Sequence, residues 1–481
     1  MAPPMLELFN REQLDKIHEA SMEILSKIGI LIESEEMLQL VAEHVPDVDM
    51  KSGRARIDES TLMEWVKKAP GEITLCGRDP KNDLPHPAKR PGYGCPDGQP
   101  AEVFDLDSGR RRYSTKKDCV ELAKLADALP EIGLYWPMVS ATDMPGEICS
   151  YYELVASLDN TTKHIQHGAN GHEEAAFQIE YASAIAGSPE ELRRRPILSN
   201  THTPISPLVL DKNQIEGAVA LSRAGIPNIH LTMVIQGSTG PVTVAGSLAQ
   251  ANAEILASIA VCQMAAPGCP SIYSCESGAM DMRSGVFMSG SIEGALITAG
   301  ACQLSHMYGL PNQMGGLAAS GAVPGYEVGF QKAMSGLIPA MAGADAVVGI
   351  GGLNRSGVES AVQMVIDCEL WRFIERGVRE ISVDADALAI DVIEQVGPGK
   401  TYLTNKHTLR HFKQEIAMPG LASGRSMENI DCEEEMIVNA KERAKKIIAE
   451  HESPEFPSDL KKELDEIYKR HSEMKMKSRR S

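Results

Sequence analysis

The sequence predicts an α/β protein built on a (β/α)8 barrel, preceded by an α+β extension and followed by a helical one. Between residues 91 and 360, short apolar runs alternate with long segments of helical periodicity, which is typical of βαβ units and a parallel sheet. Eight such units over about 270 residues fit a closed barrel better than an open sheet. The composition, 43% apolar and 23% charged in 481 residues, is that of a globular chain with a large core.

The N-terminal extension is expected to span residues 1–90 and to mix helices with short strands. Apolar residues recur at helical spacing before Gly29, which is a plausible stop signal. The segment 81–91 holds three prolines and no periodicity, so we expect a linker there. The predicted elements are helices at 12–28 and 34–43 and strands at 54–57 and 72–76.

The barrel is expected to span residues 91–360, with one strand at each apolar run. The candidate strands are 93–97, 134–140, 164–169, 197–203, 229–236, 271–276, 312–319 and 346–352. An open, doubly wound sheet is the alternative, because Pro96 and Pro137 weaken two of these assignments.

The C-terminal extension, residues 361–481, is helical in pattern and increasingly charged. The segment 433–450 runs from acidic to basic residues, which matches the dipole of a helix. The Leu- and Ala-rich helices of the chain and its long extensions lead us to expect self-association into a homo-oligomer.

Charge and targeting signals narrow the class of protein. With 47 Lys and Arg against 66 Asp and Glu, the formal charge is −19, which argues against a nucleic-acid partner. No uninterrupted apolar stretch reaches the about 18 residues of a spanning helix, and the start of the chain lacks a signal-peptide layout. We therefore expect a cytoplasmic protein that does not associate with a membrane. The ten cysteines include no CxxC pair and are expected to be reduced.

In a (β/α)8 barrel the site lies at the C-terminal ends of the strands, so polar residues that close each apolar run are candidates. Each one alone is more often a strand-end residue bonded to nearby backbone, but several converging ends predict a site. The candidates are Asp97, His167, His202, Gln236, Thr239, Glu276 and Gln313.

Aromatic residues make up only 5% of the chain, so their positions are informative. Tyr135, Trp136 and Tyr273 lie in predicted strands, and Tyr326 follows the seventh one. Rings gathered at the barrel mouth could cage a quaternary ammonium group, at about 0.5–2 kcal/mol per cation–π contact. The alternative is that they fill the core. Tyr135 and Trp136 point to opposite faces of a strand, so at most one faces the lumen.

The sequence also bears on three other kinds of site, for a carboxylate, for a metal and for a nicotinamide cofactor. The turn 237–241 precedes a long apolar helix, so Thr239 lies at an expected helix start whose free amides would suit a carboxylate; a plain helix cap explains it equally well. There is no HEXXH and no HxC motif, so no tightly bound metal is expected. The glycines at 349–352 do not complete a dinucleotide-binding motif, so a nicotinamide site is set aside.

Several co-linear motifs resemble the trimethylamine:corrinoid methyltransferase family. They are GRDP at 77–80, QGSTGPVTVAG at 236–246, APGCPSIY at 266–273 and GSIEGALITAGACQLSHMYGL at 290–310. The resemblance extends in order over nearly the whole chain. It implies a (β/α)8 barrel that passes a methyl group from an amine to the Co(I) centre of a separate corrinoid protein.

The resemblance also implies a substrate class. Founding members carry pyrrolysine after the seventh strand, whereas the matching stretch here, 318–327, has an ordinary residue near Ala322. This places the chain with the non-pyrrolysine members, whose characterised examples demethylate betaines. A quaternary ammonium that loses a methyl cation leaves as a neutral amine, so no general acid is needed.

We therefore predict a betaine:corrinoid methyltransferase with the following roles. Asp97 and Glu276 supply negative potential, and with His202 they are the expected catalytic group. The rings of Tyr135 or Trp136, Tyr273 and Tyr326 face the ammonium, and the carboxylate end of the substrate is held by His167, His202, Gln236 and Thr239. Gln313 is a further substrate contact. Glycines are expected to let the flat corrin approach closely, namely Gly315, Gly316, Gly349, Gly351 and Gly352.

Two other classes of function remain open from the sequence. A metal-dependent barrel lyase or hydrolase could use Asp97, His202 and Glu276. A non-catalytic protein could bind a quaternary amine through the same aromatic residues. The sequence does not choose among glycine betaine, proline betaine and carnitine.

Overall fold

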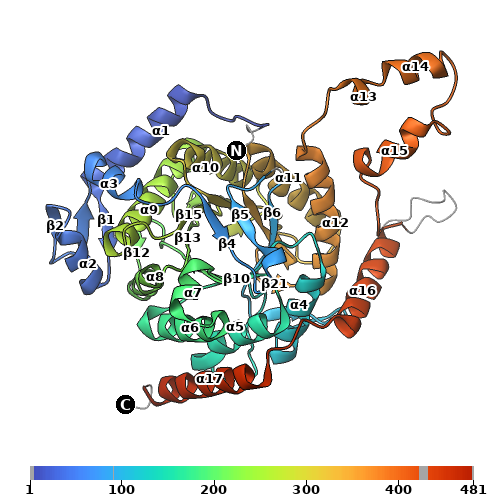
Figure 1. Cartoon of the computed structure of the whole chain (residues 1–481). Coiled ribbons are helices and arrows are strands. Elements are labelled where there is room, and N and C mark those ends of the chain that lie inside the picture. Colours follow the sequence, from blue (N-terminus) through green and yellow to red (C-terminus); the bar gives the residue numbers. More distant parts are fainter. Residues whose placement is uncertain (1–4, 90, 422–431, 479–481) are drawn as a thin grey trace.

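A computed structural model of the chain describes residues 5–89, 91–421 and 432–478, and a closed barrel of parallel strands lies at its centre (Figure 1). Around the barrel the strand order is β6-β19-β18-β15-β13-β11-β10-β9, and a parallel bridge between Gly94 and Ile132 closes the ring. The barrel strands are β6 (Tyr93–Pro96), β9 (Leu134–Tyr135), β10 (His164–His167), β11 (Leu198–His202), β13 (Asn228–Thr232), β15 (Ser271–Cys275), β18 (Asn312–Gly315) and β19 (Ala346–Ile350). Each lies within one of the eight predicted runs or one residue beyond it, so the predicted barrel is confirmed and the open sheet is not formed.

One main helix follows each barrel strand and packs on its outer side. These helices are α4 (Lys116–Ala128), α5 (Cys149–Asn160), α6 (Gly171–Ala186), α8 (Lys212–Ala224), α9 (Val244–Ala265), α10 (Ile292–Tyr308), α11 (Tyr326–Ala342) and α12 (Ala361–Val378), with the short α7 (Pro189–Arg194) after α6. By length and composition α9 could cross a membrane, but 83% of its most apolar window is buried inside the protein. That burial is typical of a core helix.

The N-terminal region contacts the barrel through helices and through a shared sheet. The predicted helices form as α1 (Arg11–Glu23), which continues in a π-helical turn to Ile28 and stops at Gly29 (φ +81°), and as α2 (Glu35–Ala42). A strand from the barrel's own loop, β12 (Val209–Leu210), extends the N-terminal sheet in the order β12-β1-β3-β2. The other elements are β1 (Ile30–Ile32), β2 (Asp47–Asp49), β3 (Arg54–Arg56) and α3 (Glu59–Val66). Both α1 and α3 pack on α9.

A hairpin closes the N-terminal end of the barrel. It consists of β4 (Ile73–Leu75) and β5 (Leu84–His86), which pair antiparallel across the short 3-10 helix Pro80–Asn82. Leu75 and Leu84 belong to the same apolar cluster as the barrel interior. The expectation of a plain linker from residue 81 is therefore wrong for β5, because its alternate side chains plug the barrel.

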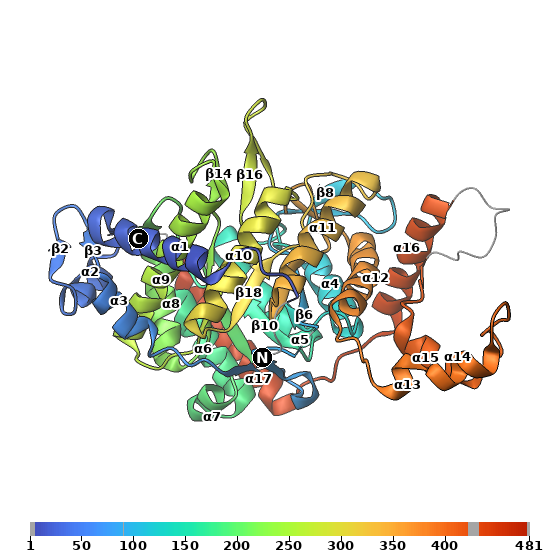
Figure 2. The ribbon, with the colours of Figure 1, turned by 90° about the horizontal axis from the view of Figure 1, so that it is seen from above.

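Small sheets stand over the opposite, C-terminal end of the strands. One contains β14 (Ile235–Gln236), β16 (Gly278–Asp281) and β17 (Val286–Met288), and Figure 2 shows it extending away from the barrel on the side opposite α7. The other has the order β20-β21-β7-β8. Its strands are β7 (Glu102–Phe104), β8 (Arg111–Tyr113), β20 (Gly352–Leu353) and β21 (Val358–Glu359).

The C-terminal region has two parts with different packing. Helices α16 (Cys432–Glu450), predicted at 433–450, and α17 (Ser458–Ser478) pack on the barrel helices, α16 against α12 and α4 and α17 against α6. Before them, residues 381–418 form a segment that projects from the barrel (Figures 1 and 2), which we call the arm. It carries α13 (Ala385–Leu388), α14 (Ile390–Val396) and α15 (Lys406–Glu415).

Candidate active site

Strand alternation decides which side chains enter the barrel. The interior cluster contains Cys95, Leu134, Ile229, Leu231, Ile272, Ala346 and Val348, with Trp136 packed against it. Because side chains two positions apart share a face, the residues in step with this cluster also face the lumen. These are Asp97, Gln166, Ser199, Thr201, Ser274, Glu276 and Gln313.

The lumen is polar, and several of its buried groups lack hydrogen-bond partners among the described residues. Gln166 Oε1 accepts hydrogen bonds across it, from Gln313 Nε2 at 2.9 Å and from Cys95 Sγ at 3.9 Å. The unpartnered atoms are Trp136 Nε1, Gln166 Nε2, Ser199 Oγ, Thr201 Oγ1, Ser274 Oγ and Gln313 Oε1. A buried polar group without a partner costs about 1–3 kcal/mol, so these atoms suit a polar ligand.

Two carboxyl groups lie at the C-terminal end of this lumen. Asp97 is buried and accepts hydrogen bonds from the Gly98 amide and the Ser356 hydroxyl. Glu276 follows β15 directly and packs against Gly315. Burial, and then the nearby Asp97 charge, raise the pKa of Glu276 to about 8. In the free protein Glu276 therefore keeps its proton at neutral pH.

A second group of buried charges lies beside Asp97 and was missed by the sequence analysis. Lys332 on α11 is fully buried and donates to Asp367 Oδ2 at 2.8 Å and to two backbone carbonyls. Glu359 is also fully buried, and neither of its carboxyl oxygens has a hydrogen-bond partner among the described residues. Burial and the charge of Asp97 hold the pKa of Glu359 well above its usual range, so this group is neutral.

The two predicted histidines face away from the lumen. His167 Nδ1 lies 3.2 Å from Gln178 Nε2 on α6. The ring of His202 lies 6.0 Å from that of His230, and His230 Nδ1 lies 2.6 Å from Ser258 Oγ on α9. Burial lowers the pKa of His202 to about 4. The expectation that either histidine reaches into the lumen was wrong, because both sit between the barrel wall and the helices.

The three predicted tyrosines also lie outside the lumen. Tyr273 donates its hydroxyl hydrogen to Asn252 Oδ1 on α9 at 3.0 Å, and Tyr135 lies in the apolar layer between strands and helices. Tyr326, at the start of α11, is 82% exposed and lies outside the lumen. Of the four predicted rings, only Trp136 packs inside the barrel.

The side chains of Gln236 and Thr239 form hydrogen bonds within their own loop. The Thr239 hydroxyl accepts the Ile235 amide at 2.9 Å, and Gln236 donates to the Val242 carbonyl. Helix α9 begins later, at Val244. The prediction of a helix start at Thr239 was therefore wrong, because this turn closes the β14 loop instead.

The five glycines expected at the corrin are buried and contact the protein's own groups. A Cβ on Gly315 would lie 2.5 Å from Glu276 Cγ, and one on Gly352 would lie 2.1 Å from Asp97 Oδ2. A Cβ on Gly351 would approach Glu359, and those on Gly316 and Gly349 would meet backbone oxygens. Gly315, Gly351 and Gly352 therefore leave space for acid side chains, and Gly316 and Gly349 leave space for backbone. That these glycines face a corrin ring stays a prediction.

A large cavity lies at the other end of the barrel. It has a volume of about 1290 Å³ and is lined by the β4–β5 hairpin, by Arg379 and by Ile381 at the base of the arm. The paired acids are absent from its lining. Because active sites of (β/α)8 barrels lie at the C-terminal ends of the strands, the acid-lined end is the candidate site.

The fold and the site define a barrel enzyme with an acid-lined, polar lumen. A sequence profile of the trimethylamine methyltransferase (MTTB) family matches residues 2–475. The chain belongs to this family of methyltransferases, as its motifs indicated.

Individual relatives differ in the substrate that they are named for. A trimethylamine methyltransferase MttB of Desulfitobacterium hafniense (strain DSM 10664 / DCB-2) is 30% identical over 85% of this chain and 82% of its own length. A glycine betaine methyltransferase of Desulfitobacterium hafniense (strain Y51) is also 30% identical, over 96% of both chains. The MttB of Methanosarcina barkeri is 32% identical over 84% of this chain and 82% of its own.

Solved structures support the fold. The Methanosarcina barkeri monomethylamine methyltransferase (MtmB) matches with a TM-score of 0.53 at 10% identity, over 92% of this chain and 89% of that one. A hydroxylamine complex of MtmB matches with a TM-score of 0.55, also at 10% identity and over the same shares.

The Lys332–Asp367 pair gives a prediction for the stability of the site. Replacing Lys332 by Met should lower the free energy of unfolding by about 3–5 kcal/mol, because Asp367 is left buried without its cation. The double variant Lys332→Met/Asp367→Leu should recover much of that loss. Chemical denaturation measures both, and Lys16→Met, which removes an exposed ion pair with Glu12, is the matched control. Equal losses in the single and double variants would contradict this account of the pair.

Proposed function

We propose that the protein transfers a methyl group from a betaine, a quaternary ammonium carboxylate, to the Co(I) of a separate corrinoid protein. The observation that carries the proposal is the pairing of Asp97 and Glu276 at the end of a polar lumen. Neither acid forms an ion pair with a side chain in the described part of the chain. The nearby Lys332 is bonded to Asp367 instead, so the two acids favour a positively charged substrate.

In this proposal the ammonium end of the substrate lies at the acid-lined end of the lumen, with Asp97, Glu276 and the indole of Trp136 as its contacts. A permanent positive charge beside Glu276 favours loss of its proton, so binding creates the carboxylate that holds the cation. The face of an indole ring adds cation–π attraction of about 0.5–2 kcal/mol. A quaternary nitrogen offers no proton, so acids and ring faces are the contacts available to it.

In this proposal the carboxylate end accepts hydrogen bonds from the unpartnered donors of the lumen. Trp136 Nε1, Gln166 Nε2 and the hydroxyls of Ser199, Thr201 and Ser274 can all donate to an anion. With the carboxylate held there, the N-methyl groups point toward the C-terminal mouth. Trimethylamine has no carboxylate and would leave these donors unpaired, which supports a betaine as substrate.

The mouth of the barrel suits a docked protein that carries the corrinoid. Its loops expose large apolar side chains, namely Val242, Met282, Val323, Tyr326 and Phe330. They come from the loops after β13, β15 and β18 and from the start of α11. An apolar rim would exclude water when the partner docks, and a Co(I) corrin supplies the nucleophile for the methyl group.

Self-association stays a prediction. The arm exposes apolar side chains, including Leu403 at 85% and Leu409 at 72%, that a second copy of the chain could cover. Light scattering of the purified chain reports the mass of the particle and so tests this prediction directly.

The substrate class is tested by methyl transfer to a purified corrinoid protein, followed by its visible spectrum. Glycine betaine, proline betaine, carnitine and trimethylamine form the panel. One carboxylate-bearing quaternary amine should exceed trimethylamine in kcat/KM by at least about 100-fold, because it satisfies the donors of the lumen. A preference for trimethylamine would contradict the proposal.

The pKa of Glu276 predicts a pH dependence. In the free enzyme the group is neutral below about pH 8 and ionised above it, so kcat/KM should rise as the pH increases through about 8. The variant Glu276→Gln should be slower by about 10- to 100-fold and should lose this rise. Glu293→Gln, at the exposed start of α10, is the control and should keep the wild-type profile. A wild-type profile in Glu276→Gln would remove Glu276 from the site.

A further inference from the structure

The arm has almost no apolar core of its own. In its described helices, α13 and α15 bury no residue and α14 buries only Val396. A segment of about 40 residues that buries so little needs another constraint to hold a fixed shape, such as a metal ion or a disulfide. No disulfide is formed by the described cysteines.

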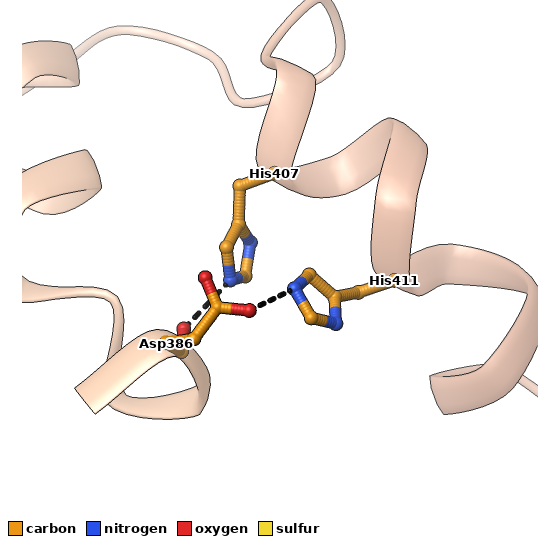
Figure 3. Close-up of side chains that lie close together, drawn as sticks. All are labelled: Asp386, His407 and His411. Carbon is orange, nitrogen blue, oxygen red and sulfur yellow. Dashed lines mark hydrogen bonds and ion pairs between the residues drawn. The ribbon is translucent and has the colours of Figure 1, made fainter. Parts of the chain in front are cut away.

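Two histidines and one aspartate converge inside the arm (Figure 3). His407 and His411 lie one turn apart on α15, with ring centroids 4.2 Å apart. Both rings point toward Asp386 on α13. His411 Nε2 lies 3.0 Å from Asp386 Oδ2, and His407 Nε2 lies 3.0 Å from the Asp386 carbonyl oxygen.

The donor set has the chemistry of a transition-metal site. One ligand atom from each residue can be chosen so that all lie within 4.8 Å of one another. Ligands of a tetrahedral Zn²⁺ lie about 3.3 Å apart at bond lengths of about 2.0–2.2 Å, so rotations of partly exposed side chains would close the site. Two imidazoles and one carboxylate favour Zn²⁺, Co²⁺, Ni²⁺ or Cu²⁺ over Mg²⁺ or Ca²⁺.

The hydrogen bond from a neighbouring arginine leaves one carboxylate oxygen of Asp386 available to a metal. Arg410 donates to Asp386 Oδ1 at 3.0 Å, which leaves Oδ2 facing His411. His411 Nε2 is shielded from solvent but lies outside hydrogen-bond geometry. By contrast, the cluster of Glu36, His172 and Glu216 has a single imidazole.

We propose that Asp386, His407 and His411 bind one divalent transition-metal ion of the Zn²⁺ class, which ties α13 to α15 and holds the arm in its folded shape. The site would be structural, since it lies on the arm and not at the barrel mouth. The proposal does not depend on the methyl-transfer reaction. It adds a metal to a chain whose sequence led us to expect none, because the histidine spacing, HxxxH, was not among the motifs considered.

The test uses the full chain, purified without a histidine tag and stripped of metal with EDTA. Titration with Co²⁺ should give the visible absorption of a low-symmetry cobalt site that saturates at one equivalent and is displaced by Zn²⁺. His407→Gln and His411→Gln should each lose this band, while His172→Gln, in the other cluster, should keep it. A wild-type chain that shows no band, or His variants that keep it, would overturn the proposal.

Hydrogen exchange separates metal binding from misfolding. Adding Zn²⁺ to the stripped wild-type chain should slow exchange of α13 and α15 amides by about 10-fold or more, while barrel amides stay unchanged. In His411→Gln the arm should exchange rapidly with or without Zn²⁺, with barrel protection intact. Equal protection of the arm in the stripped and Zn²⁺-loaded wild type would refute the structural role.

Discussion

The two-residue alternation of side chains around a closed barrel is the constraint on which the site depends. Each strand residue faces either the lumen or the helix layer, and a shift of one position exchanges the two. On β15 this rule sends Tyr273 to Asn252 on α9 and Ser274 to the lumen. The chemistry available at the mouth of the barrel follows from that choice, repeated on every strand.

Burial gives the paired acids their properties. Gly315 and Gly352 leave space for Glu276 and Asp97, and the two carboxyl groups are buried near enough for their charges to interact. Desolvation then raises the pKa of Glu276 and makes its ionisation depend on an incoming positive charge. Nearby, Lys332 is bound to Asp367 and two carbonyls, so it compensates a neighbouring charge without filling the substrate position.

The barrel and the family could be predicted from the sequence, because apolar runs and motifs are local signals. Asp97, Glu276, Trp136 and Gln313 were also found, and they face the lumen, although their roles stay predictions. The direction in which the His202 and Tyr273 side chains point was not predictable from the strand ends alone. An apolar run in the sequence shows where a strand ends more reliably than which of its side chains face the lumen. Lys332 and Glu359 lie on a helix and on a short strand outside the barrel, and only long-range packing brings them to Asp97. Strand β4 of the plug was predicted at 72–76, but β5 was missed because three prolines hid a strand that pairs on one edge.

Neighbouring residues on opposite faces of β15 offer the most direct test of the central claim, that the lumen binds a betaine. Calorimetry would measure glycine betaine affinity in Ser274→Ala and Tyr273→Phe, with the other betaines used where glycine betaine does not bind the wild type. The account predicts that Ser274→Ala weakens binding by about 5- to 100-fold, because a buried donor to the carboxylate is lost, and that Tyr273→Phe keeps the wild-type affinity. Weakened binding in Tyr273→Phe with unchanged binding in Ser274→Ala would contradict it.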